Sequence, residues 1–67
     1  MKYTKKKAWE TIDTYKDMTG FYDNDSEYSI SQNDMYNMLR YRMKFGEAET
    51  RVIIAALVIS GAKFKEV

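Results

Sequence analysis

Cysteine and histidine, two residue types on which many active sites depend, are both absent from this 67-residue chain. Without cysteine there is no disulfide, thiolate nucleophile or sulfur ligand, and without histidine the usual general base and commonest metal ligand is missing. The sequence also lacks a dinucleotide-binding, Walker or nucleophile-elbow motif. We therefore predict a non-enzymatic protein with no catalytic residues, no cofactor and no metal site.

Proline is also absent, and glycine occurs three times, at Gly20, Gly46 and Gly61. Each glycine follows a stretch with helical periodicity, where a residue free to adopt a positive φ commonly ends a helix. We expect all three to end helices, which leaves no glycine for a phosphate-binding loop.

An excess of one charge and a long apolar run are lacking as well. Eleven basic and ten acidic residues give a net charge of +1, unlike the strongly basic balance expected of proteins that bind phosphate backbones. The longest apolar run, Val52 to Ile59, is far shorter than the roughly 20 residues that cross a bilayer, and no apolar signal segment follows the basic N-terminus. We expect a cytoplasmic protein with no membrane partner.

The residues that are present predict one all-α domain over residues 1–67, a compact three-helix domain. The expected helices span residues 5–19, 32–45 and 47–60, with a polar loop or short hairpin at residues 21–30. The first helix begins behind Thr4. Its apolar residues fall on one side at helical spacing: Ala8, Trp9, Ile12, Tyr15 and Met18.

The second helix has the clearest start. Ser31 is the expected N-cap, and Asp34 follows three residues later as an acidic relative of the capping box. Ile30, just before the cap, is placed to pack against Met35. These signals fix the beginning of the helix more firmly than any other boundary in the chain.

The segment "FYDNDSEYSI" before this helix is polar at its centre and aromatic at its edges. It is either an irregular loop or a hairpin in which Phe21 and Tyr22 pair with Tyr28 and Ile30. Its acids resemble the spacing of an EF-hand loop, but Tyr28 stands where the sharp turn needs glycine, and the bidentate glutamate at the twelfth position is replaced by aspartate. Calcium binding is therefore not expected.

Helix 32–45 contains the stretch "DMYNMLRYRMKFG", in which methionine, tyrosine and basic residues alternate. At about 100° per residue, one arc of this helix is apolar and predicted to be core: Met35, Met38, Leu39, Met43 and Phe45. The opposite arc forms a polar ridge with an aromatic ring at its edge: Asn33, Asn37, Arg40, Lys44 and Tyr41. We predict that this ridge is the partner-binding surface.

Arg42 is the exception on this helix, because the same spacing points it into the methionine arc. A buried guanidinium needs a carboxylate partner, which Glu47, Glu49 or an acid of the preceding loop would supply. The alternative is that Arg42 lies near the helix end, where its stem covers apolar surface and its charge reaches water. Arg42 joins the candidate partner-binding residues on either interpretation.

Helix 47–60 is apolar on all sides between Val52 and Ile59, which indicates a helix enclosed by other elements or by a second subunit. One side carries smaller residues: Ala48, Val52, Ala55, Ala56 and Ile59. The opposite side carries larger ones: Ile53, Ile54, Leu57 and Val58. This helix is either the centre of a three-helix core or a self-associating face that makes a homodimer through Val52–Ile59.

Two charged features remain. Lys5, Lys6 and Lys7 stand at the N-terminus of the first helix, where the helix dipole disfavours them; they form a secondary basic patch that would meet phosphate, or a solvated helix end. The acids of the same helix, Glu10, Asp13 and Asp17, are best explained as a solvated helix face.

Two functions fit these features. The first is a small interaction protein, an inhibitor, adaptor or assembly factor of the kind that bacteriophages and mobile elements encode, which binds a larger protein. The alternative is a small DNA-binding transcriptional regulator that inserts helix 32–45 into a major groove. Net charge near zero argues against the second, as does an apolar helix after the Gly46 turn, where the recognition helix would stand.

Overall fold

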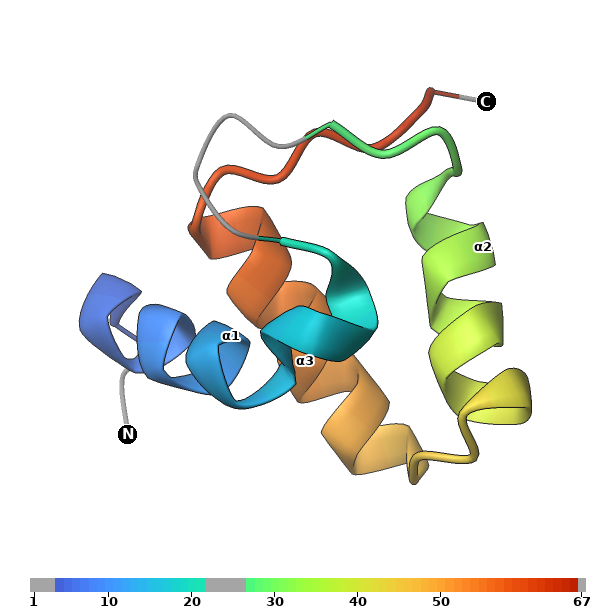
Figure 1. Cartoon of the computed structure of the whole chain (residues 1–67), viewed down its shortest axis with the longest axis horizontal. Helices are drawn as coiled ribbons and strands as arrows, with labels where there is room; N and C mark the ends of the chain where they lie inside the picture. The colour runs from blue at the N-terminus through green and yellow to red at the C-terminus, as the bar shows by residue number, and fades with distance from the viewer. Residues whose placement is uncertain (1–3, 22–26, 67) are drawn as a thin grey trace.

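A computed structural model describes residues 4–21 and 27–66 of the chain. The described residues form three helices, α1 (Lys5–Thr19), α2 (Gln32–Asn37) and α3 (Glu47–Ile59), and contain no strand. A π-helical segment, η1 (Met38–Arg42), continues α2 without a break (Figure 1). The predicted all-α three-helix domain is confirmed. The first helix has the predicted bounds, whereas the second ends three residues early.

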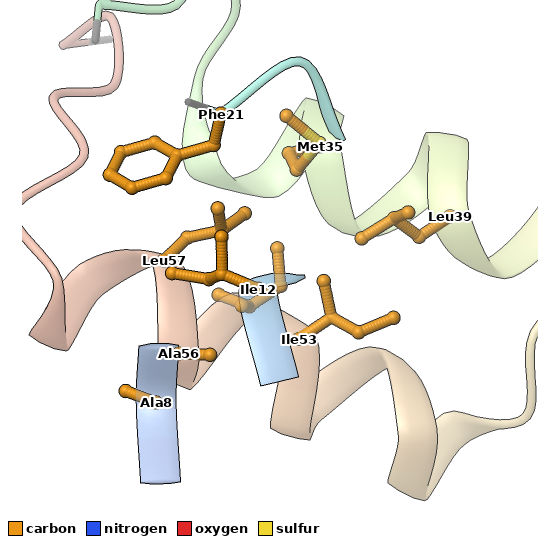
Figure 2. Close-up of a cluster of buried hydrophobic side chains, with 9 residues drawn as sticks. Ala8, Ile12, Phe21, Met35, Leu39, Ile53, Ala56 and Leu57 are labelled. Atoms are coloured by element: carbon orange, nitrogen blue, oxygen red, sulfur yellow. The ribbon is translucent and has the colours of Figure 1, made fainter. Parts of the chain in front are cut away.

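The core lies against one side of α3. Among the described residues, the backbone of α3 comes close to those of α1, α2 and η1, whereas no Cα of α1 lies within 8 Å of a Cα of α2. Figure 2 shows side chains from all of these elements meeting above α3. The buried hydrophobic residues are Ala8, Ile12, Phe21, Met35, Leu39, Ile53, Ile54, Ala56 and Leu57. The bundle is therefore joined through α3.

Short polar side chains begin the first two helices, as predicted. The hydroxyl of Thr4 accepts a hydrogen bond from the backbone N–H of Lys7 at 3.2 Å, and that of Ser31 accepts one from Asp34 at 3.1 Å. Each bond satisfies one of the backbone donors that the first turn of a helix leaves unpaired. The predicted N-cap at Ser31 is confirmed.

The end of the second helix differs from the prediction. The backbone N–H of Met43 bonds to the carbonyl of Met38 at 3.0 Å, five residues back, and Lys44 then takes a positive φ of 61°. Lys44 thus holds the left-handed position expected of Gly46. Gly46 has a φ of −66° and begins α3 in an extended conformation, so its predicted role is wrong. Gly20 and Gly61 do have positive φ, as expected.

Two methionines that helical spacing placed on the apolar sides of their helices are exposed. Met18 is 50% exposed because at about 100° per residue it stands roughly 120° from Ile12, whereas Thr19 stands only about 20° away and is buried instead. Met43 is exposed because it follows the π turn, which holds more residues than an α turn and shifts later side chains off the α-helical arc.

The segment 27–30 runs beside the C-terminal tail (Figure 1). The N–H of Tyr28 bonds to the carbonyl of Lys63 at 2.8 Å, and the N–H of Lys65 bonds to the carbonyl of Ile30 at 2.9 Å. The Tyr28 ring stacks on Phe64 with centroids 5.0 Å apart. Tyr28 and Ile30 therefore pair with the tail rather than across a hairpin; the remainder of the predicted turn, residues 22–26, lies outside the described residues.

Two tyrosines tie distant segments together. The Tyr15 hydroxyl on α1 donates to the carboxylate of Glu49 on α3, and its ring meets Phe45 edge to face with centroids 5.5 Å apart. This hydrogen bond to Glu49 is the main reason that the pKa of Tyr15 is raised. Burial is the main reason that the pKa of the Tyr28 phenol is raised. Both phenols are therefore held in the neutral form.

Gly46→Ser and Gly20→Ser should change stability in opposite directions. A Cβ at either position meets nothing within 4 Å, so the backbone decides the sign. At Gly46 the φ suits any residue and α3 has no side-chain N-cap bond, so serine should raise the free energy of unfolding by about 0.5–1 kcal/mol. At Gly20, where φ is 71°, serine should lower it by about 1 kcal/mol. Urea unfolding followed by circular dichroism measures both, and an equal sign would contradict this assignment.

The fold should lose stability as the pH rises above about 10, the ordinary pKa of tyrosine. The raised pKa values of Tyr15 and Tyr28 mean that the unfolded chain ionises first, so their contribution is full below pH 10 and is lost through their folded-state pKa. Tyr15→Phe and Tyr28→Phe should each flatten the alkaline fall in the urea midpoint relative to the wild type. Unchanged slopes in both variants would contradict this explanation.

Candidate interaction surfaces

The predicted polar ridge does not form one surface, because three of its residues line two different grooves and Arg40 and Lys44 line neither. Asn37, Tyr41 and Arg42 line a groove of about 400 Å³, which we call the Tyr41 groove. Its remaining lining residues are Ile30, Asp34 and Met38. Asn33 lies one turn earlier and lines a different groove, between α2 and α3. Three of the six predicted partner-binding residues are thus brought together.

Tyr41 is the most exposed of the large hydrophobic residues that the structure describes, at 67%. The guanidinium of Arg40 lies over its ring, 5.5 Å from the centroid, and Arg40 Nη1 donates to the carbonyl of Phe45 at 3.4 Å. Arg40 is half-buried in this arrangement, whereas Lys44 is exposed in the turn that follows. Arg40 therefore positions the ring of Tyr41 instead of standing free on the ridge.

Arg42 does not face inward, and that expectation is wrong. Its side chain is exposed, and two of the expected carboxylate partners are engaged elsewhere, while most of the preceding loop lies outside the described residues. Glu47 accepts from Arg51 at 3.0 Å, and Glu49 accepts from Tyr15. The π turn explains the difference, because it turns Arg42 away from the buried arc to the side of Met38. The alternative, a stem on apolar surface with the charge in water, matches the Tyr41 groove.

The basic patch lies at the free end of α1. Lys5, Lys6 and Lys7 are exposed, and the first turn of the helix holds no acidic residue. Lys6 borders a hollow of about 470 Å³ beside Trp9, whose ring lies 5.5 Å from that of Phe21. The patch is separate from the Tyr41 groove, since the two share no lining residue.

The acids of α1 show no site for a cation. Asp13 pairs with Lys16 at 3.4 Å, with the Asp13 side chain largely in water and the Lys16 side chain about half exposed. Within residues 4–21 and 27–66, no group of three or more acidic side chains lies close enough together to hold a metal ion.

The second surface is the outer face of α3, defined here by its exposed or half-exposed residues: Ala48, Arg51, Val52, Ala55, Val58 and Ile59. Its larger aliphatic side chains are substantially exposed, Val52 at 45%, Val58 at 48% and Ile59 at 39%. Val58 lies on this face although the sequence placed it on the opposite side, and Ala56 is buried although the sequence placed it with the small residues.

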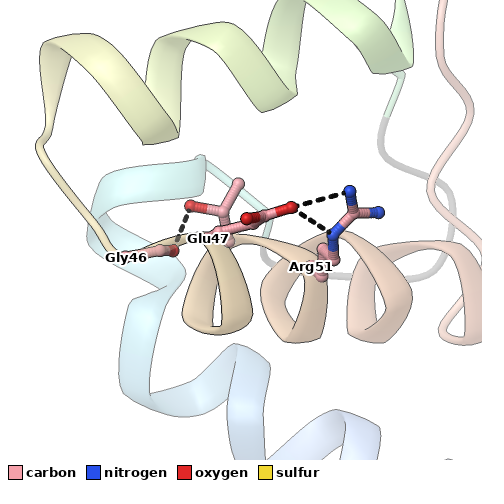
Figure 3. A network of polar contacts seen from close by, with 4 residues as sticks. Gly46, Glu47 and Arg51 are labelled. Carbon is pink, nitrogen blue, oxygen red and sulfur yellow. Dashed lines mark hydrogen bonds and ion pairs between the residues drawn. The ribbon is translucent and has the colours of Figure 1, made fainter.

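The one charged side chain of this face, Arg51, forms a salt bridge within α3. Figure 3 shows the Arg51 guanidinium donating twice to one oxygen of Glu47. The Thr50 hydroxyl donates to the carbonyl of Gly46 at 2.9 Å. The hydrogen bond to Glu47 is the main reason that the pKa of Arg51 is raised. Arg51 also lies 5.7 Å from the ring centroid of Tyr36 on α2.

Tyr36 and Arg51 border a groove of about 670 Å³ between α2 and α3 that the sequence did not predict. Its other lining residues are Gln32, Asn33, Ile54, Ala55, Val58 and Ile59. The spacing of Gln32 and Tyr36, four residues apart on one side of α2, is a signal of this groove. The packing of α2 against that side of α3 is a tertiary contact, and helical periodicity in the sequence does not predict it.

Comparisons of this chain with protein-family models, with curated proteins and with solved structures found no match. None of the helices in the described part of the chain is long and apolar enough to span a membrane.

Proposed function

We propose that this chain is a small non-enzymatic interaction protein that binds a larger protein through the Tyr41 groove. The observation that carries the proposal is the exposed, pre-positioned ring of Tyr41 beside an apolar hollow. Tyrosine and arginine are the residue types that most often dominate binding energy at protein interfaces. A ring already held by Arg40 loses little conformational freedom when it is covered.

The groove also indicates the chemistry of the partner segment. Ile30 and Met38 are half-buried and give it an apolar lining, while Arg42 and Asp34 carry opposite charges at its border. A segment with an apolar or aromatic side chain and a neighbouring carboxylate would fill the hollow and pair with the exposed guanidinium of Arg42. A methionine in the lining adapts to such a side chain better than a branched residue does.

DNA binding has less support from the same residues. The positive charges of the predicted ridge do not stand together, because Arg40 is turned to the Phe45 carbonyl and Lys44 lies in the turn. Asp34 in the groove would repel phosphate. The helix after the turn, α3, has one side in the core and an outer face with a single arginine, which gives it little with which to contact base edges.

Tyr41→Ala and Arg42→Ala should each reduce recovery of the partner at least about tenfold when the tagged chain is used to capture proteins from lysate of its source cells. Quantitative mass spectrometry identifies proteins whose recovery falls with both substitutions. Met18→Ala is the matched control, since it removes a large, half-exposed apolar side chain from α1 and should leave recovery unchanged. Circular dichroism checks that all variants are folded.

Equal recovery of every captured protein by wild type and both groove variants would overturn the proposal. Binding to a random duplex DNA at low salt, weakened steeply by added salt and by Lys44→Ala, would do so as well and would favour the regulator instead.

A further inference from the structure

The outer face of α3 is mainly apolar, and no part of the described chain covers it. Around the helix at about 100° per residue, the buried residues occupy one half of the circumference and the outer face the other. Arg51 is the only charge in the middle turns of the exposed half, and Glu47 neutralises it. A helix that is apolar on both halves is expected where a second element covers the exposed half.

The spacing on this face is that of a helix-to-helix seam. Ala48, Val52, Ala55 and Ile59 follow one another at intervals of four, three and four residues, which is the a and d spacing of a coiled coil. All four are exposed or half-exposed. A seam of this spacing brings one straight stripe of the helix against a neighbouring helix over its whole length, about 20 Å.

We infer that two copies of this chain pair through the outer faces of α3, with the two helices antiparallel. In that pairing the stripe complements itself, because Val52 lies opposite Ala55 of the second copy and Ile59 lies opposite its Ala48. Each branched side chain then meets a small one, which lets the helices approach closely. In a parallel pair, alanine would meet alanine and leave a gap, and isoleucine would meet isoleucine and crowd the helices apart.

Charge also favours a second copy over a charged partner. The salt-bridged Glu47 and Arg51 leave the face neutral, and a net charge of +1 gives little repulsion between copies. Antiparallel helices align their dipoles favourably. A twofold axis brings the same flank of both helices together, so the α2/α3 groove faces the Arg51 flank of the second copy. The groove thus adds area toward the roughly 800 Å² per partner that stable interfaces bury.

The pairing is independent of the proposed function. No residue of the Tyr41 groove belongs to the outer face of α3. A dimer therefore presents two Tyr41 grooves, and failure of either proposal leaves the other testable.

Light scattering on the purified chain at about 0.1 mM, above the micromolar dissociation constants at the weak end of specific interfaces, should give twice the chain mass of 7.9 kDa. Val52→Lys should weaken the dimer at least about tenfold, because it places an ammonium in the seam. Lysine is a good helix former at this exposed site. Met18→Lys is the matched control, with a similarly exposed apolar residue on α1, and should remain dimeric. A monomeric wild type, or a dimer unaffected by Val52→Lys, would overturn the inference.

Because the chain has no cysteine, single introduced thiols test the direction of the pair. A mixture of Ala48→Cys and Ile59→Cys chains should form a disulfide-linked heterodimer on mild oxidation. Ile59→Cys alone should not crosslink, since the two thiols would lie about 16 Å apart along the helices. Efficient crosslinking of Ile59→Cys with itself would show a parallel pair and contradict the antiparallel arrangement.

Discussion

The packing of one half of α3 against every other helix is the constraint on which this small domain depends. No Cα of α1 lies within 8 Å of a Cα of α2 among the described residues, so each helix is held mainly through α3. Leu57, fully buried from α3, and Ile12 from α1 lie in the same cluster as Leu39 from η1. A chain of 67 residues has little other apolar surface to bury. The rest of the molecule is arranged around this one-sided core.

The π turn is the second determinant, because it decides what the surface of the second helix presents. By fitting an extra residue into its last turn, the helix moves Arg42 from the core to the groove and leaves Met43 exposed. It also brings Arg40 over the ring of Tyr41 and within reach of the Phe45 carbonyl. Such turns occur often at functional sites. Here the irregular end of the helix carries the exposed ring of Tyr41.

The sequence predicted those elements whose signals are local. Thr4 and Ser31 cap helices through bonds within one turn, and Gly20 needs only its own backbone freedom. Such signals depend on neighbours in the chain, so the bounds of α1 and the start of α2 could be read directly. The fold class followed from them.

The features that the sequence did not predict depend on contacts or on a changed helical period. A helical wheel drawn at a constant 100° per residue cannot represent a π turn. It therefore placed Arg42 and Met43 on the wrong side of the second helix. Lys44 took the left-handed position because the helix ended before Gly46. The pairing of Tyr28 with Lys63 joins segments 35 residues apart and leaves no periodic pattern. The grooves arise in the same way, from how α2 rests on α3.

The aliphatic residues on the outer face of α3 need an explanation that the monomer does not supply. Val52, Val58 and Ile59 are β-branched, and each favours a helix less than alanine does, by roughly 0.5 kcal/mol. The part of each side chain left in water also forgoes the free energy of burial, which is about 25 cal/mol for each Å² of apolar surface. Local propensity and burial therefore both disfavour them at these positions. A second helix packed on this face would bury these side chains and so remove the cost of their exposure. Because Val52 and Ile59 alternate with alanines, an identical helix is the neighbour that fits.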